Sequence, residues 1–116
     1  MTAATSHSNS IARKRLQAAI VHIQASVGET LPHMQNEAAL VVDDQGILCG
    51  IVTDGDVRRA FLKGASHNTP IAEIMTRRPV TVAADTPREI ILRLMLTHQI
   101  RHIPVVDHTY RPVALE

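Results

Sequence analysis

The sequence predicts an α+β fold made of two β-α-β-β-α repeats, packed on each other about a pseudo-twofold axis, with the second repeat truncated. The main observation is a strand–turn–strand pattern that occurs twice. NEAALVVD at 36–43 aligns with IRHIPVVD at 100–107, and ILCGIV at 47–52 aligns with RPVALE at 111–116. Both pairs are 64 residues apart, which is hard to obtain by chance. The other observation is that short apolar runs alternate with amphipathic helical periods.

The composition is that of one globular domain and argues against several classes of protein. The chain has 116 residues, of which 12 are basic and 11 acidic, and aromatic residues make up 2%. We therefore expect no nucleic-acid partner that binds through charge or base stacking. A single cysteine, Cys49, excludes a disulfide framework. No apolar run approaches the roughly 18 residues of a membrane span, and the first ten residues do not form a signal peptide, so we expect a cytoplasmic protein without a membrane partner.

The first third of the chain is predicted to be mostly helix and loop. Residues 1–9 are small and polar, which favours a disordered N-terminus. Apolar side chains then recur every three or four positions from Leu16 to Ile23, which predicts an amphipathic helix over 11–25. The stretch 27–37 reads as a loop, with a short strand at 30–34 as an alternative.

A β-hairpin followed by a helix is the most informative prediction. The apolar runs Ala38–Val42 and Ile47–Thr53 flank the turn sequence DDQG. A helix over 54–63 follows directly, and Gly64 is a suitable residue to end it. The remaining predicted elements are a short helix at 70–76, a strand at 79–83, a helix at 87–98, and strands at 103–106 and 111–115. We place the repeats at 10–68 and 69–116.

Thr53 and Asp56 lie three residues apart where the hairpin passes into the helix. This junction places a hydroxyl, a carboxylate and free helix N–H groups together, a combination that suits a phosphate and ribose hydroxyls. Gly55 permits close approach of the backbone. The same spacing is also a capping box, in which the two side chains serve only the helix. The two roles can coexist. Asp54 is expected to be solvated and to point away from the site.

Two segments, VVDDQGILCGIVTDGDVRRAFLKG and EIMTRRPVTVAADTPREIILRLMLTHQIRHIPVVD, resemble a tandem CBS-domain pair, also called a Bateman module. The resemblance covers about residues 10–116. The sequence is similar to the CBS pairs that are attached to sugar-phosphate isomerases of the arabinose 5-phosphate type and to sugar nucleotidyltransferases. Neither catalytic domain occurs in this sequence.

The resemblance implies a non-catalytic, regulatory module that senses an adenine nucleotide such as AMP or ATP, or a related sugar nucleotide, in the cleft between the repeats. It also implies a homodimer. By motif, the ligand-binding residues are those for ribose and phosphate oxygens (Thr53, Asp56), those beside the base (Gly50, Ile51), the apolar wall of the preceding strand (Ala39, Val41) and the basic residues facing phosphates (Arg101, His102).

The sequence departs from this pattern in both repeats. The counterparts of Thr53 and Asp56 would fall beyond Glu116, so the second site is incomplete in this sequence, and we expect the strands Ile103–Val106 and Val113–Leu115 to need cover from a second copy. In the first repeat, the strand before the first helix is missing or replaced by residues 28–34.

No arrangement of residues supports catalysis or a cofactor. No activated nucleophile is apparent, and no metal site is expected from the seven histidines. His98 and His102 are four residues apart, but we place one at a helix end and the other at a strand start. Two alternatives remain: a dimerisation module with vestigial clefts, and a regulatory fragment of a sugar-phosphate isomerase or nucleotidyltransferase.

Overall fold

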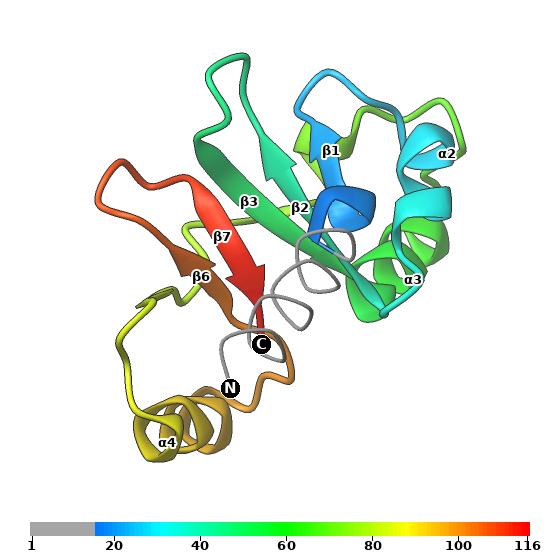
Figure 1. The fold of residues 1–116 in the computed structure, drawn as a ribbon. Helices are drawn as coiled ribbons and strands as arrows, with labels where there is room; N and C mark the ends of the chain where they lie inside the picture. Colours follow the sequence, from blue (N-terminus) through cyan, green and yellow to red (C-terminus); the bar gives the residue numbers. More distant parts are fainter. Residues whose placement is uncertain (1–15) are drawn as a thin grey trace.

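A computed structural model describes residues 16–116 as two small sheets with helices on their outer faces (Figure 1). The predicted disorder of residues 1–9 and the start of the predicted helix lie outside the described residues. Along the chain the elements are β1 (Ile20–His22), α2 (Val27–Thr30), η1 (Leu31–His33), β2 (Ala38–Val42), β3 (Leu48–Thr53), α3 (Asp54–Leu62), η2 (Ile71–Glu73), β4 (Thr76–Arg77), β5 (Val82–Ala83), α4 (Arg88–His98), β6 (Pro104–Val106) and β7 (Pro112–Leu115).

The two sheets share one topology. The first has the order β1-β2-β3-β4 and the second β5-β6-β7. In each sheet a parallel pair, β1 with β2 or β5 with β6, is followed by an antiparallel hairpin, β2–β3 or β6–β7. The sequence predicted both hairpins and the helices α3 and α4. It did not predict β4, which has two residues and extends the first sheet beside β3.

The predicted helix over 11–25 is wrong in its second half. Residues 16–19 are helical, but Ile20–His22 is the strand β1, paired in parallel with β2. Leu16, Ile20 and Ile23 satisfy a helical period, but the run Ile20–Val21 also suits a buried strand. Pairing with β2 decides between the two. The strand that the sequence analysis expected to be missing from the first repeat is therefore present, one element earlier than residues 28–34.

The stretch 27–37, predicted as a loop or a strand, is largely helical. The helix α2 begins with a capping box, in which the Ser26 hydroxyl accepts from the Glu29 N–H and the Glu29 carboxylate accepts from the Ser26 N–H. The bond from the Ser26 N–H to the carboxylate, followed by the Ser26 side chain, lowers the pKa of Glu29. The short helices α2 and η1 thus connect β1 to β2 as α4 connects β5 to β6.

Three apolar clusters hold the layers together. One lies between the first sheet and its helices and includes Val27 and Ile71. A second joins the two sheets, with Leu40 and Ile51 packed with Val106. The third lies between the second sheet and α4 and is centred on Ile103. The strand Ile103–Val106 is therefore buried within the chain, and the expectation that it needs outside cover is wrong. In the second strand of that expectation, Val113–Leu115, Val113 is 43% exposed.

The two hairpin turns are structural equivalents. Asp43 Oδ1 accepts from the N–H groups of Gln45 and Ile47, and Asp107 Oδ1 accepts from the N–H groups of Thr109 and Arg111. Further along each turn, Gly46 and Tyr110 both have positive φ, at 80° and 65°. The hydroxyl of Thr109, followed by the Arg111 N–H, lowers the pKa of Asp107.

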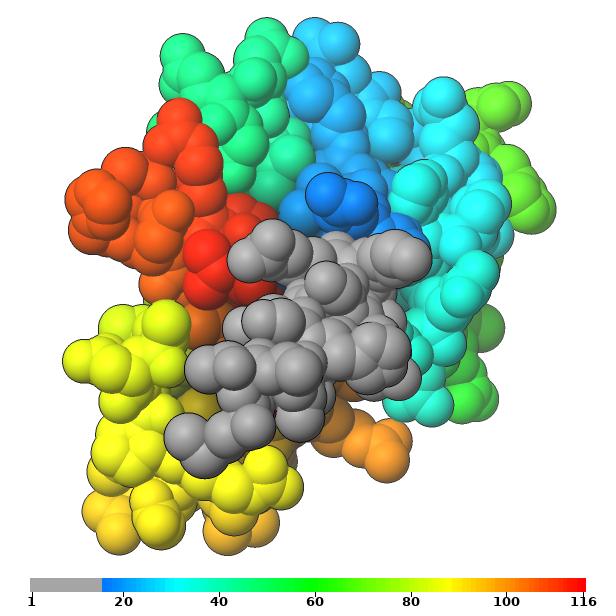
Figure 2. All heavy atoms as spheres, in the orientation of Figure 1, coloured from blue at the N-terminus to red at the C-terminus, as the bar shows by residue number. Residues whose placement is uncertain are grey.

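These turns also bind the repeats to each other, and their spheres touch in Figure 2. The Leu48 N–H donates to Tyr110 O at 3.0 Å. The symmetric bond cannot form, because Pro112 stands at the equivalent of Leu48 and has no N–H. Instead, Arg111 Nε donates to Gln45 O at 2.7 Å. One side chain thus replaces the backbone donor that the pseudo-twofold would require.

Tyr110→Asn is expected to raise the free energy of unfolding by about 0.5–1 kcal/mol. A non-glycine residue at φ 65° is strained, and asparagine adopts this conformation at lower cost than tyrosine. Chemical denaturation measures the change. Tyr110→Ala is the control, because it removes the ring but keeps the strain. An equal gain in both variants would contradict the argument.

Candidate functional site

One cleft of about 520 Å³ lies between the repeats, at the end of β3 and the start of α3. The first repeat and the segment after it contribute one wall, and the C-terminal end of α4 with the residues that follow it contributes the other. Its lining residues are Glu37, Ile51, Thr53, Asp54, Gly55, Asp56, Arg59, Thr76, Arg78, Pro79, Val80, His98, Gln99, Ile100, Arg101 and His102.

Thr53 and Asp56 form a capping box at the start of α3. The Thr53 hydroxyl accepts from the Asp56 N–H at 3.3 Å, and Asp56 Oδ2 accepts from the Thr53 N–H at 2.9 Å. The Thr53 hydroxyl also donates to Asp56 Oδ2 at 3.1 Å. The capping interpretation of this pair is therefore confirmed, and both residues still line the cleft.

The Asp56 carboxylate has two further partners. Arg59 Nη2 donates to Oδ1 at 2.8 Å, and the Thr76 hydroxyl lies 3.4 Å from both oxygens. The Asp56 side chain is 12% exposed, whereas the Arg59 side chain is 64% exposed. A ligand hydroxyl could replace the long Thr76 contact or the mobile end of Arg59 without breaking the cap.

The helix N-terminus is less open than the sequence analysis expected. The N–H groups of Thr53 and Asp56 serve the cap, and the Asp54 N–H donates to Glu37 O at 3.2 Å. The predicted set of free N–H groups is thus largely used within the chain. A phosphate would find its main cationic partners elsewhere in the cleft.

Asp54 is exposed, as predicted, but it does not point away from the cleft. It lines the cleft together with Asp56. At the first helical position the chain is still leaving β3, so the angular spacing of a regular helix does not describe where the side chain lies.

The second repeat brings Arg101 and His102 to the cleft, at the start of the segment that leads into β6. The sequence analysis missed Arg78, Pro79 and Val80, which line the cleft between β4 and β5. Among residues 16–116, Arg78 and Arg101 form no salt bridge. They are therefore available for an anionic group of a ligand.

Three predicted site residues do not line the cleft. Ala39 and Val41 are fully buried in the cluster on the other face of the first sheet. Side chains alternate between the two faces of a strand, so Gly50 does not share the face of Ile51 and Thr53. Val41 pairs with Gly50, and Ala39 is two residues before Val41 on the same strand, so both point to the face opposite the cleft. Gly50 instead allows β4 to approach, because a Cβ there would lie 2.8 Å from Thr76 O. Of the eight predicted residues, the structure brings together Ile51, Thr53, Asp56, Arg101 and His102.

Other chemical groups in the described part of the chain are isolated. Cys49 is half-buried, and burial raises the pKa of its thiol. Within residues 16–116 no three His, Cys, Asp or Glu side chains lie close enough to hold a metal ion. In that same range no helix is long and apolar enough to cross a membrane.

A comparison with protein families finds the same two copies as the internal repeat. A family model for the CBS domain matches this chain twice, at residues 11–63 and 71–114. The chain belongs to the CBS domain family. Its two copies form a CBS pair, and the boundary that we predict at 68/69 falls between the two matches.

Relatives of this CBS pair are longer proteins. The meiotically up-regulated gene 70 protein of Schizosaccharomyces pombe is 41% identical over 93 residues, which are 75% of this chain and 13% of that protein. The arabinose 5-phosphate isomerase GutQ of Salmonella typhi is 36% identical over 67 residues, 58% of this chain and 21% of the isomerase. The chain thus spans a small part of either relative.

Solved structures of CBS proteins have the same fold. The CBS domain pair of protein MJ0100, in complex with 5′-methylthioadenosine and S-adenosyl-L-methionine, is 29% identical with a TM-score of 0.76, covering 84% of this chain and 82% of that one. CBSX2, in complex with AMP, is 25% identical with a TM-score of 0.69, covering 84% and 78%.

Proposed function

We propose that this CBS pair is a non-catalytic regulatory module that binds an adenine nucleotide, or a related nucleotide, in the cleft between its repeats. The observation that carries the proposal is the cleft itself, which is lined by carboxylates at the start of α3 and by Arg78 and Arg101. The ligands of the MJ0100 pair and of CBSX2 all contain adenosine, which supports an adenine base.

Each part of such a ligand has a suitable partner. The apolar side chains of Ile51, Val80 and Ile100 offer a surface for the base. Asp56 would accept hydrogen bonds from the ribose hydroxyls in place of Thr76 or Arg59. Arg78 and Arg101 would bind the phosphate, with His102 beside them.

A thermal-shift screen tests the proposal, with AMP, ADP, ATP, S-adenosylmethionine, NAD and sugar nucleotides. We expect at least one adenine compound to raise the melting temperature, because a ligand that binds only the folded state stabilises it. The absence of any shift up to millimolar concentrations would contradict a nucleotide-binding role and favour a vestigial cleft.

Arg101→Ala is expected to weaken binding of the best nucleoside phosphate by about ten-fold, the loss of one charge-assisted contact. Binding of the bare nucleoside should hardly change, because the guanidinium is assigned to the phosphate. Calorimetry measures both. The matched control is Arg93→Ala, because Arg93 is an exposed residue of α4 that does not line the cleft. Equal losses for nucleoside and nucleotide would contradict this role.

We also propose a homodimer that packs through exposed helix faces. Leu62 at the end of α3 is 78% exposed, and Leu92 and Leu96 on α4 are 47% and 80% exposed. Large apolar side chains gathered on a helix favour a protein partner.

Sedimentation at tens of micromolar is expected to give twice the 12.7 kDa chain mass. Leu96→Glu should shift the protein toward monomer, because it places a charge in the apolar contact. Thr97→Glu, one position along the same helix, is the control. A clean monomer for the unaltered protein would overturn the dimer.

The remaining predictions concern the protein's context. We propose that residues 10–68 and 69–116 act as one sensor in the cytoplasm, without turnover of nucleotides or sugar phosphates. The identity with GutQ favours regulation of a sugar-phosphate enzyme as a second candidate role. The full-length reading frame would test it, since that role requires an attached or neighbouring isomerase domain.

A further inference from the structure

The charges that line the cleft balance. Three arginines, Arg59, Arg78 and Arg101, line it together with three carboxylates, those of Glu37, Asp54 and Asp56. Arg59 is already paired with Asp56 at 2.8 Å. Within the described residues this leaves two arginines and two carboxylates, Glu37 and Asp54, without a salt bridge. The cleft is therefore not the strongly positive pocket that a triphosphate would favour.

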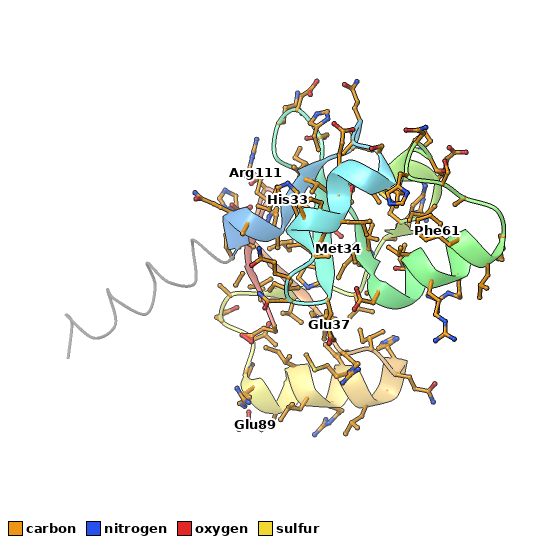
Figure 3. All side chains as sticks on the ribbon, turned by 90° about the vertical axis from the view of Figure 1, so that its right-hand side faces the viewer. His33, Met34, Glu37, Phe61, Glu89 and Arg111 are labelled. Carbon is orange, nitrogen blue, oxygen red and sulfur yellow. The ribbon has the colours of Figure 1, made fainter. Side chains whose placement is uncertain are left out.

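Glu37 is held at this position by the backbone around it. It precedes β2 with φ at 70°, its N–H donates to Met34 O at 3.0 Å, and its carbonyl accepts from the Asp54 N–H at 3.2 Å. Figure 3 places Glu37 on the side of the strands that faces α4. Its side chain is exposed, so its charge is not satisfied within the protein.

The internal repeat puts Glu37 at the equivalent of Arg101, because the two residues are 64 positions apart. Glu37 directly precedes β2, and Arg101 lies in the segment that leads into β6. Both line the same cleft. At this pair of equivalent positions the molecule therefore presents one negative and one positive side chain to a ligand.

We infer that Glu37 is a specificity-determining residue that disfavours nucleoside polyphosphates, so that the cleft takes nucleosides with at most one phosphate. This inference rests on the proposed function. Arg78 and Arg101 can neutralise the two negative charges of a monophosphate. Additional phosphates would bring charge near Glu37 and Asp54, where like charges repel and where residues 16–116 supply no further unpaired arginine to the cleft lining.

Calorimetry with adenosine, AMP and ATP on the unaltered protein and on Glu37→Gln tests this inference. The unaltered protein should bind AMP at least as tightly as ATP. Glu37→Gln should raise the affinity for ATP by about three- to ten-fold, the range expected when one solvent-exposed charge near the ligand is removed. The affinity for adenosine should not change, because adenosine is uncharged. Glu37→Lys should extend the gain for ATP in the same direction.

Glu89→Gln is the matched control, since Glu89 is an exposed carboxylate on α4 that does not line the cleft (Figure 3). It should leave all three affinities unchanged. If AMP binds but both Glu37 variants keep the ratio of ATP to AMP affinity of the unaltered protein, the inference is overturned and the proposed function stands. A preference of the unaltered protein for ATP would also overturn it. If none of the three compounds binds, the inference is overturned, and the thermal-shift screen with the other nucleotides decides the proposed function.

Discussion

Gly50→Ala is expected to lower the free energy of unfolding by about 2–3 kcal/mol, the cost of overpacking a closely packed site. A Cβ at this position would lie 2.8 Å from Thr76 O and 2.8 Å from Met75 Sδ. Thr76 O belongs to the backbone of β4, which pairs with β3 at this point, so the contact cannot be relieved by a side-chain rotation. The strand β4 would have to move away from the sheet.

Gly55→Ala provides the control for this prediction. Its Cβ would meet only the guanidinium end of Arg59, at 3.0 Å, and that flexible group can move. Urea denaturation should therefore give a much smaller loss than for Gly50→Ala. Because β4 leads directly to Arg78 in the cleft wall, Gly50→Ala should also weaken nucleotide binding. Equal stability of the two variants would mean that β4 is not held as described.

Asp56→Ala is expected to weaken nucleotide binding by about ten-fold to a hundred-fold. A carboxylate that binds ribose hydroxyls makes charge-assisted hydrogen bonds, each worth roughly 1.5–3 kcal/mol, and about 1.4 kcal/mol is a factor of ten. The substitution also releases Arg59 and removes half of the capping box. Asp54→Ala should change affinity by less than about three-fold. Its carboxylate lies in the cleft but is exposed.

Asp56→Asn separates the cap from the charge. The amide oxygen can still accept from the Thr53 N–H, so stability in urea should be largely retained while calorimetry records the loss of affinity. If Asp56→Asn binds as well as the unaltered protein, the residue serves only the helix cap. If Asp54→Ala loses as much affinity as Asp56→Ala, the ribose contact belongs to both carboxylates.

Local patterns were sufficient to predict much of this fold. The turn DDQG between two apolar runs predicted the hairpin β2–β3. The recurrence of this strand–turn–strand pattern 64 residues later predicted the hairpin β6–β7. The spacing of Thr53 and Asp56 predicted the capping box, because a cap depends only on residues three apart. The resemblance to CBS pairs implied that Arg101 and His102 would face the ligand, and both line the cleft.

Other features depended on contacts between distant residues. Ile20–His22 became a strand because β2 lies beside it, and a helical period could not reveal that pairing. Ala39 and Val41 were assigned to the cleft, although strand alternation turns them to the other face of the first sheet, where they pack with Val27 and Ile71 in the core. Glu37 and Arg78 reach the cleft only when the two repeats pack together. Local sequence thus specified the elements and the helix cap, whereas long-range packing, which no local pattern encodes, specified which faces meet and which charges share the cleft.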